Sequence, residues 1–260
     1  MPEPSALAPA VNMSGQKPNY GLDAPEIIRR FLSFGGAMLI CGFGALLFGS
    51  RYPIARWFVA PFVSVATSFL GIAAIMVWGS KFGKLRLRDK LIASLALRGD
   101  ERVLDVGCGH GLMLLGAAKK LTSGRAVGID LWQKEDQAGN SREATLENAV
   151  CEGVAERVEL IDGDARQMPF DKESFDVILS SWALHNIYDA AGPRRALEEI
   201  VRVLKSGGRI LITDIRHASE YANVFRSLGL ADVRVSAPSF IFVIPSRCVA
   251  ARKAKAIFST

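Results

Sequence analysis

Two long uncharged apolar stretches, residues 31–49 and 57–79, constrain this chain most. At a rise of 1.5 Å per residue, a helix over the first stretch would be about 28 Å long, close to the roughly 30 Å hydrocarbon core of a bilayer. The second stretch has a tryptophan near each end, where indole rings favour the headgroup region. Only residues 50–56 separate them. The sequence therefore predicts a membrane-spanning helical hairpin over residues 26–80.

A buried hairpin in a soluble protein is the alternative. Half of the residues are hydrophobic, and the apolar excess is concentrated in these two stretches. A core helix rarely stays apolar on every face for about 20 residues, which favours the membrane. Small residues recur every four positions on the second helix, a pattern that brings backbones together in lipid, although ordinary composition explains it equally well. The residues of this row are Ala60, Ser64 and Ser68.

Basic residues flank the hairpin unequally. Arg29 and Arg30 precede it and five basic residues follow it between Lys81 and Lys90, against two arginines in the turn. Because positive charge concentrates on the cytoplasmic side, we expect a multi-pass membrane protein with both termini and the catalytic domain in the cytoplasm. The formal net charge of +6 includes no basic stripe interleaved with aromatic residues, so nucleic acid is not an expected partner.

The rest of the composition concerns the N-terminal segment, metal binding and the oligomeric state. Residues 1–25 contain five prolines among small and polar residues, which predicts a flexible tail. The four cysteines have no metal-ligand or disulfide spacing, so we expect no metal site. The sequence leaves the oligomeric state open.

Residues 81–260 alternate short β-branched runs with amphipathic stretches, a pattern typical of a parallel α/β sheet. Residues 232–235 and 248–251 are expected to pair as an antiparallel hairpin at the end. The other predicted strands are 102–106, 126–131, 158–161, 176–180 and 209–213, and the predicted helices are 84–97, 111–121, 141–152, 193–204 and 218–228.

A glycine-rich turn follows the first of these strands, at residues 105–111 (DVGCGHG). Glycines let a backbone turn tightly and approach a ligand closely. A dinucleotide fingerprint needs a third glycine where Leu112 stands, which disfavours an oxidoreductase. The form DxGxGxG instead resembles the first motif of class I S-adenosylmethionine (SAM)-dependent methyltransferases.

The resemblance extends over about residues 98–215. Acidic residues end the second strand (Asp130) and follow the third (Asp164), and residues 202–209 (RVLKSGGR) resemble the helix-to-strand junction of small-molecule methyltransferases, including the ubiquinone/menaquinone methyltransferase-like (type 11) group. Ser206 replaces the usual proline there. The resemblance implies a Rossmann-like fold, a mostly parallel sheet with a C-terminal antiparallel strand, and SAM as the cofactor.

The same resemblance implies roles for single residues. Asp130 would accept hydrogen bonds from the ribose hydroxyls of SAM, Leu131 would lie against the adenine, and Asp164 and the Ala165 amide would contact the adenine edge. The strand that ends near Ser180 would face both cofactor and acceptor. The full expected cofactor-binding set is Asp105, Gly107, Cys108, Gly109, Gly111, Asp130, Leu131, Asp164, Ala165 and Ser180.

The methyl group of a sulfonium is already activated, so alignment of the reactants and exclusion of water are the main requirements. His185, just past the fourth strand, is the candidate to accept a proton or hold the acceptor, with a structural histidine as the alternative. A membrane hairpin makes sense when the acceptor is in the bilayer, so we expect a small, lipid-like acceptor. A soluble acceptor, with the hairpin only for localisation, and a noncatalytic SAM-binding scaffold are the alternatives.

Overall fold

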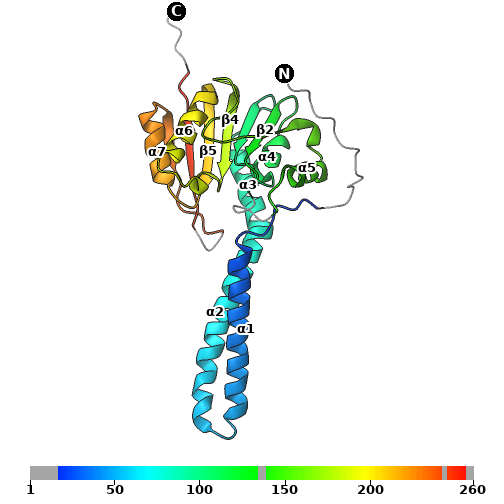
Figure 1. Cartoon of the computed structure of the whole chain (residues 1–260), viewed down its shortest axis with the longest axis vertical. Helices are drawn as coiled ribbons and strands as arrows, with labels where there is room; N and C mark the ends of the chain where they lie inside the picture. Colours follow the sequence, from blue (N-terminus) through cyan, green and yellow to red (C-terminus); the bar gives the residue numbers. More distant parts are fainter. Residues whose placement is uncertain (1–16, 134–138, 242–244, 256–260) are drawn as a thin grey trace, which may run out of the picture.

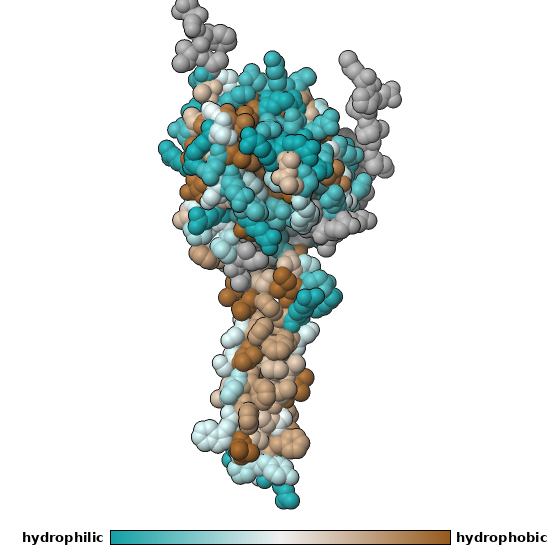
Figure 2. Space-filling model, turned by 60° about the vertical axis from the view of Figure 1, so that its left-hand side comes forward, coloured by the Kyte–Doolittle hydropathy of each residue, from teal (hydrophilic) through white to brown (hydrophobic). Residues whose placement is uncertain are grey.

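The computed structural model describes residues 17–133, 139–241 and 245–255 of the chain. An α/β domain carries a pair of long helices that projects from it as a stalk (Figure 1). The domain is largely hydrophilic on its surface, whereas the stalk is predominantly hydrophobic (Figure 2).

The stalk consists of α1 (Pro25–Phe48) and α2 (Val59–Trp78), joined through a 3-10 turn, η1 (Pro53–Phe58). A single π-turn, η2 (Gly79–Gly83), continues α2 into α3 (Lys84–Ser94), which lies against the domain. Both stalk helices are long and apolar enough to cross a membrane, by length and composition. Only 11% of the most apolar window of each is buried, so their side chains mostly face outward. The two predicted helices are therefore present, and their insertion in a bilayer stays a prediction.

Small residues form the seam between the stalk helices, but not the predicted ones. Gly35 and Gly42 of α1 are buried against α2, and Ala66 and Ala73 of α2 are fully buried. These positions are seven residues apart on each helix, so each pair lies on one face. The row predicted for this contact lies on exposed positions of α2 instead: Ala60, Ser64 and Ser68.

Replacing Gly35 with valine should separate the stalk helices. A Cβ atom at Gly35 would lie 2.8 Å from Cγ of Leu70, closer than packed carbon atoms tolerate, whereas one at the neighbouring Gly36 would meet nothing within 4 Å. Overpacking of this kind costs about 1–3 kcal/mol. Thermal melting of the full-length protein in detergent should show a clear loss for Gly35→Val and little for Gly36→Val. Equal losses in the two variants would contradict this seam.

The domain is built on a seven-stranded sheet in the order β3-β2-β1-β4-β5-β7-β6. The first five strands are parallel, and β7 runs antiparallel to both β5 and β6. This is the predicted Rossmann-like class I methyltransferase fold, including its antiparallel C-terminal strand. The strands are β1 (Arg102–Val106), β2 (Arg125–Asp130), β3 (Val158–Asp162), β4 (Phe175–Ser181), β5 (Leu204–Asp214), β6 (Ala231–Val235) and β7 (Arg247–Arg252).

Helices cover both faces of the sheet, and successive strand residues point to opposite faces. Val103 and Val177 pack in one apolar cluster with residues of α3, α4 and α5, whereas Leu104 and Ile178 pack in another with α6 and α7. This alternation decides which strand residues can face a ligand on the α3/α4 side. The helices are α4 (Leu112–Ala118), α5 (Arg142–Cys151), α6 (Gly192–Val203) and α7 (Ala218–Ser227).

The end of the predicted N-terminal tail differs from the expectation. Residues 1–16 lie outside the described residues, but residues 19–24, here called the strap, pack against the domain. The Tyr20 hydroxyl donates to Glu152 (2.7 Å), and the buried Lys84 ammonium donates to the carbonyls of Tyr20 and Gly21 (both 2.8 Å) and lies 3.2 Å from an Asp23 carboxylate oxygen. Burial lowers the pKa of Lys84, and the Asp23 carboxylate partly opposes this. A buried charge needs such oxygen partners, which explains why the strap is held in place.

Candidate active site

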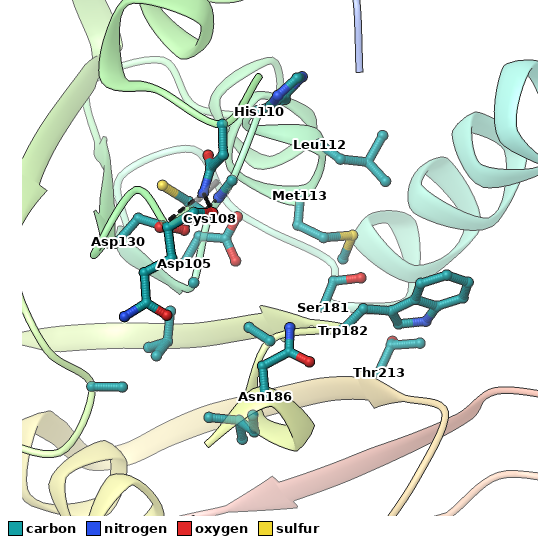
Figure 3. Close-up of a pocket in the computed structure, with 18 of the residues that line it drawn as sticks. Asp105, Cys108, His110, Leu112, Met113, Asp130, Ser181, Trp182, Asn186 and Thr213 are labelled. Carbon is teal, nitrogen blue, oxygen red and sulfur yellow. Dashed lines mark hydrogen bonds between the residues drawn. The ribbon is translucent and has the colours of Figure 1, made fainter. Parts of the chain in front are cut away.

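A cavity of about 950 Å³ lies at the carboxyl ends of β1, β2 and β4. The strand order reverses between β1 and β4, and open α/β sheets bind ligands at such a point. One side of the cavity is lined by the turn after β1 and by the ends of β2 and β3. The strap, the first turn of α1, and α3 line the other side. Figure 3 shows Asp105 and Asp130 at one end of the drawn region and Met113, Trp182 and Thr213 toward the other.

The glycine turn forms the floor of the first side. Gly107, Gly109 and Gly111 all have positive φ angles, of 69°, 49° and 83°, which glycine adopts without steric penalty. The amides of Gly107 and Cys108 donate to the carbonyl of Ile129 (2.8 and 3.3 Å), so the turn is fastened to β2. These contacts hold the backbone of Gly107 and Gly109 beside the cavity. Gly111, predicted to be in the cofactor site, does not line the cavity and instead precedes α4.

The side chain of Cys108 packs against β2. A Cβ atom added at Gly128 would lie 2.7 Å from its sulfur, which shows how close the sulfur is to β2. Burial, reinforced by Asp105 and Asp130, raises the pKa of the Cys108 thiol well above its ordinary value. The raised pKa disfavours the thiolate, which is the nucleophilic form of cysteine, so Cys108 is a packing residue beside the cavity.

Asp130 organises the turn from the end of β2. One carboxylate oxygen accepts from the Gly109 amide (2.8 Å), and the other accepts from the Trp132 amide (2.7 Å) and from the Asn140 side chain (3.2 Å). Each oxygen has two lone-pair directions, so the carboxylate can still accept from a ligand. Asn140 also lines the cavity. Its contact with Asp130 was not predicted, because no motif marks an asparagine ten residues from its partner.

Asp105 presents an unpartnered atom in the interior. Its side chain is almost completely buried; Oδ2 accepts from the Leu114 amide (2.8 Å), and Oδ1 has no hydrogen-bond partner among the described residues. Burial raises the pKa of Asp105 to about 7; the Leu114 amide opposes the rise and the nearby Asp130 charge adds to it. Such an oxygen beside the cavity fits a cationic group, the amino group of SAM being one.

Asp105 should contribute less to the stability of the ligand-free protein as pH rises from about 4 to 7. An unfolded chain loses the Asp105 proton near pH 4, whereas the folded protein keeps it until about pH 7. At this carboxyl the folded state therefore binds more protons in this window, so the contribution of Asp105 to stability decreases with pH. Asp105→Asn, which mimics the protonated carboxyl, should flatten this part of the profile. Melting temperatures of both proteins against pH test this, and parallel curves would refute it.

The adenine-side residues lie at the cavity, but Asp164 has a partner. Leu131 is half exposed and lines the cavity, as do Asp164 and Ala165. The Arg166 guanidinium donates hydrogen bonds to the Asp164 carboxylate at 2.6–3.0 Å and to the Asp189 carboxylate at 2.6 Å. These hydrogen bonds lower the pKa of Asp164. Asp164 is therefore a charged acceptor whose orientation is fixed by a residue that the sequence analysis did not single out.

Ser180 lies outside the cavity, contrary to the expectation. Its hydroxyl is buried and donates to the carbonyl of Val106 (2.8 Å), and the next residue, Ser181, lines the cavity instead. Ser180 shares its strand face with Ile178, which packs toward α6 and α7. The twofold alternation along β4 therefore places Ser181, not Ser180, on the cavity side.

His185 is directed to a neighbouring carboxylate. Its Nδ1 lies 2.7 Å from Oδ1 of the buried Asp214, and Asp214 also accepts from the Tyr221 hydroxyl (3.2 Å). The adjacent Leu184 and Asn186 line the cavity, whereas His185 does not. Asp214 lies on the α6/α7 side of β5, next to Thr213 on the cavity side, so pairing with it turns the imidazole away.

Comparisons with known proteins agree with this fold. Residues 104–212 match the family model described as "Methyltransferase domain". Demethylmenaquinone methyltransferase of Symbiobacterium thermophilum is 33% identical over 123 residues, which cover 47% of this chain and 45% of that protein. The 27-O-demethylrifamycin SV methyltransferase of Amycolatopsis mediterranei is 32% identical over 129 residues, covering 50% and 44%. The chain thus spans less than half the length of each of these relatives.

Solved structures share the fold at lower identity. The [4+2]-cyclase SpnF matches with a TM-score of 0.55 and 21% identity, over 66% of this chain and 82% of that one. A protein of Methanococcus maripaludis, described as a candidate SAM-dependent methyltransferase, matches with a TM-score of 0.54 and 16% identity, over 71% and 92%. At these identities the likeness concerns the fold alone.

Proposed function

We propose, from the premise that this chain carries a class I SAM-dependent methyltransferase domain of the type 11 group, that the protein transfers a methyl group from SAM to a small lipophilic acceptor in a membrane. One observation carries the proposal. The cavity that begins at the glycine turn and the Asp130 carboxylate ends at the first turn of α1 and at α3, where an unburied apolar hairpin joins the domain.

The bound cofactor would supply a methyl group already activated on a sulfonium. The residues of this chain would bind and orient it: Asp105 toward its amino group, Asp130 toward the ribose hydroxyls, and Leu131, Asp164 and Ala165 toward the adenine. The glycine turn permits the close backbone approach that such a ligand needs. His185 would act by positioning, since its contact is to Asp214, whose neighbour Thr213 lines the cavity.

The membrane part of the proposal divides the chain into three. Residues 1–25 form an N-terminal segment, residues 26–80 a transmembrane hairpin and residues 81–260 the catalytic domain. The basic excess outside the hairpin supports a cytoplasmic location of both termini and of the domain. The predominantly apolar, outward-facing stalk supports spanning, because about a fifth of the chain would otherwise expose hydrophobic surface to water.

The test is methyl transfer by the full-length protein in nanodiscs of phosphatidylcholine and phosphatidylglycerol. Methyl-labelled SAM is supplied with a total lipid extract or with an aqueous metabolite extract of the host cell. Label entering the organic phase, and lost in Asp130→Ala, is the expected result. Label entering only aqueous products would support a soluble acceptor and refute the lipophilic one. SAM binding without transfer to either extract would favour a noncatalytic scaffold.

A further inference from the structure

The cavity has more room than a cofactor needs, and its second end contains apolar side chains. A volume of about 950 Å³ is at the upper limit of ordinary ligand pockets. Beyond the residues assigned to SAM, the apolar part of the lining includes Leu87 and Leu91 of α3 and Ile27 of α1, and an apolar group could lie against these three. Charged side chains line the same end: Asp23, Glu26, Lys84 and Arg88.

We propose that an acceptor with one apolar tail reaches the active site through the neck of the molecule, between the first turn of α1 and α3, with its tail against Ile27, Leu87 and Leu91. The neck is defined here as residues 24–30 and 78–91, where the stalk meets the domain. We call this route through the neck the passage. That the passage carries a methyl acceptor rests on the proposed function, whereas the binding of an apolar tail there does not.

The apolar residues at α3 differ in how far the core covers them. Ile92 and Leu95 are buried in the apolar cluster on the α3/α4 side of the sheet, and Leu91 is partly buried against the same cluster. Leu87 is partly buried and belongs to none of the apolar core clusters of the described residues. Leu87 and Leu91 are one helical turn apart and so lie on the same face of α3. Ile27 remains 39% exposed. Leu87 and Ile27 therefore have apolar surface left to cover, and a hydrocarbon tail has the matching chemistry.

The distances along the helices place the neck near a bilayer surface. Leu87 follows Trp78, the last residue of α2, by nine positions, or about 13 Å of helix, and Ile27 precedes the uncharged stretch of α1 by four positions, or about 6 Å. The headgroup layer on each side of a bilayer is roughly 5–7 Å thick. A tailed molecule could thus place its head in the cavity while the tail end stays in the hydrocarbon.

The exposed surface around the neck, here called its rim, carries aromatic and basic residues of the kinds that favour the headgroup layer of a membrane. Trp78, Phe82 and Phe240 are 47%, 56% and 68% exposed, and Ile241, next to Phe240, packs beside Gly83. The same surface also has exposed basic residues, and the Arg86 guanidinium lies 5.7 Å from the Trp78 ring centre. Indole rings and basic side chains favour this layer. The exposed basic residues of the rim are Arg29, Arg30, Lys81, Arg86 and Lys90.

Photocrosslinking tests the route without any knowledge of the acceptor. The probe is a sixteen-carbon fatty alcohol with a mid-chain diazirine, added to full-length protein in vesicles of phosphatidylcholine and phosphatidylglycerol. Mass spectrometry then locates the adducts. We expect adducts on the peptide that spans residues 85–94 as well as on the stalk. Adducts confined to residues 31–78 would overturn the proposal.

Two matched variants of α3 sharpen the result. Leu87→Glu places a charge in the passage, and Ala93→Glu places the same charge on an exposed position of the same helix that does not line the cavity. We expect the α3 adduct to fall at least about fivefold in Leu87→Glu and to persist in Ala93→Glu, while SAM affinity, measured by calorimetry, stays within about twofold in both. Equal adduct levels in the two variants would overturn the proposal.

The methyl-transfer assay separates this proposal from the proposed function. Adducts at α3 without label in any lipid product would keep the passage and refute the lipophilic acceptor. Label in lipid products without α3 adducts would keep the function and refute the passage.

Discussion

Replacing Asp130 with alanine should lower the affinity of the full-length protein for SAM by roughly 10- to 150-fold. Three of the four lone-pair directions of the carboxylate are taken by Gly109, Trp132 and Asn140, so the variant would lose one hydrogen bond from a ligand hydroxyl to a charged acceptor, worth about 1.5–3 kcal/mol. Each 1.4 kcal/mol corresponds to a tenfold change in affinity. The variant would also release Gly109, Trp132 and Asn140, which the carboxylate now holds at 2.7–3.2 Å. Calorimetric titration of SAM measures the loss.

Asp162 offers a matched control for Asp130. It ends the neighbouring strand, in register with Asp130, and its carboxylate is exposed, accepting from the Trp132 indole (2.7 Å) and from Arg142 (3.2 Å). It does not line the cavity. Asp162→Ala should therefore change SAM affinity by no more than about threefold. An equal loss in the two variants, with both proteins folded by melting, would show that Asp130 has no special role.

Gly107→Ala should abolish the cofactor site or destabilise the domain. The new Cβ would lie 2.2 Å from Cβ of Ala183, far inside contact distance, and the φ angle of 69° disfavours any L side chain. We expect the backbone strain to cost about 1–2 kcal/mol and the clash about 1–3 kcal/mol more. If the turn moves to relieve the clash, the affinity for SAM should fall at least about tenfold. Melting and calorimetry together measure both effects.

Gly153→Ala is the control that tests the effect of backbone strain without a steric clash. Its φ angle is 68°, almost that of Gly107, but a Cβ there would meet nothing within 4 Å. Gly153→Ala should therefore carry only the backbone strain and leave SAM affinity unchanged. If the two variants lose equal stability and bind SAM equally well, the close approach of the turn to Ala183 has no functional consequence.

The elements of the fold could be predicted because their signals are local. Short β-branched runs and amphipathic stretches mark β1 to β5 and α3 to α7, and the structure has all of them. Some boundaries differ from the prediction: β5 begins at Leu204, five residues before the predicted strand. The stalk helices followed from length and lack of charge alone. Their contact did not, because the helical face that packs depends on the partner helix, here through Gly35 and Gly42.

The carboxylates Asp105, Asp130 and Asp164 and the glycines Gly107 and Gly109 were predicted by motif and line the cavity, whereas Gly111 does not. Three features were not predictable in this way: Asn140 on Asp130, Arg166 on Asp164, and the strap held by Lys84. Each joins side chains or segments whose neighbourhood no short motif records. His185 was chosen for its position after β4, but a contact with Asp214, on another strand, sets its direction.

By itself the sequence determined the apolar hairpin, the alternating α/β domain and the SAM motif, since periodicity, charge and glycine spacing act over a few neighbouring residues. Tertiary structure alone decided which atoms meet in the cavity. Ser181 rather than Ser180 faces it, because strand residues alternate between faces and only the packed helices define which face is which. The cavity likewise joins the cofactor residues to the neck only because α1, α3 and the strap lie beside the sheet. Long-range packing rather than local propensity brings these segments together.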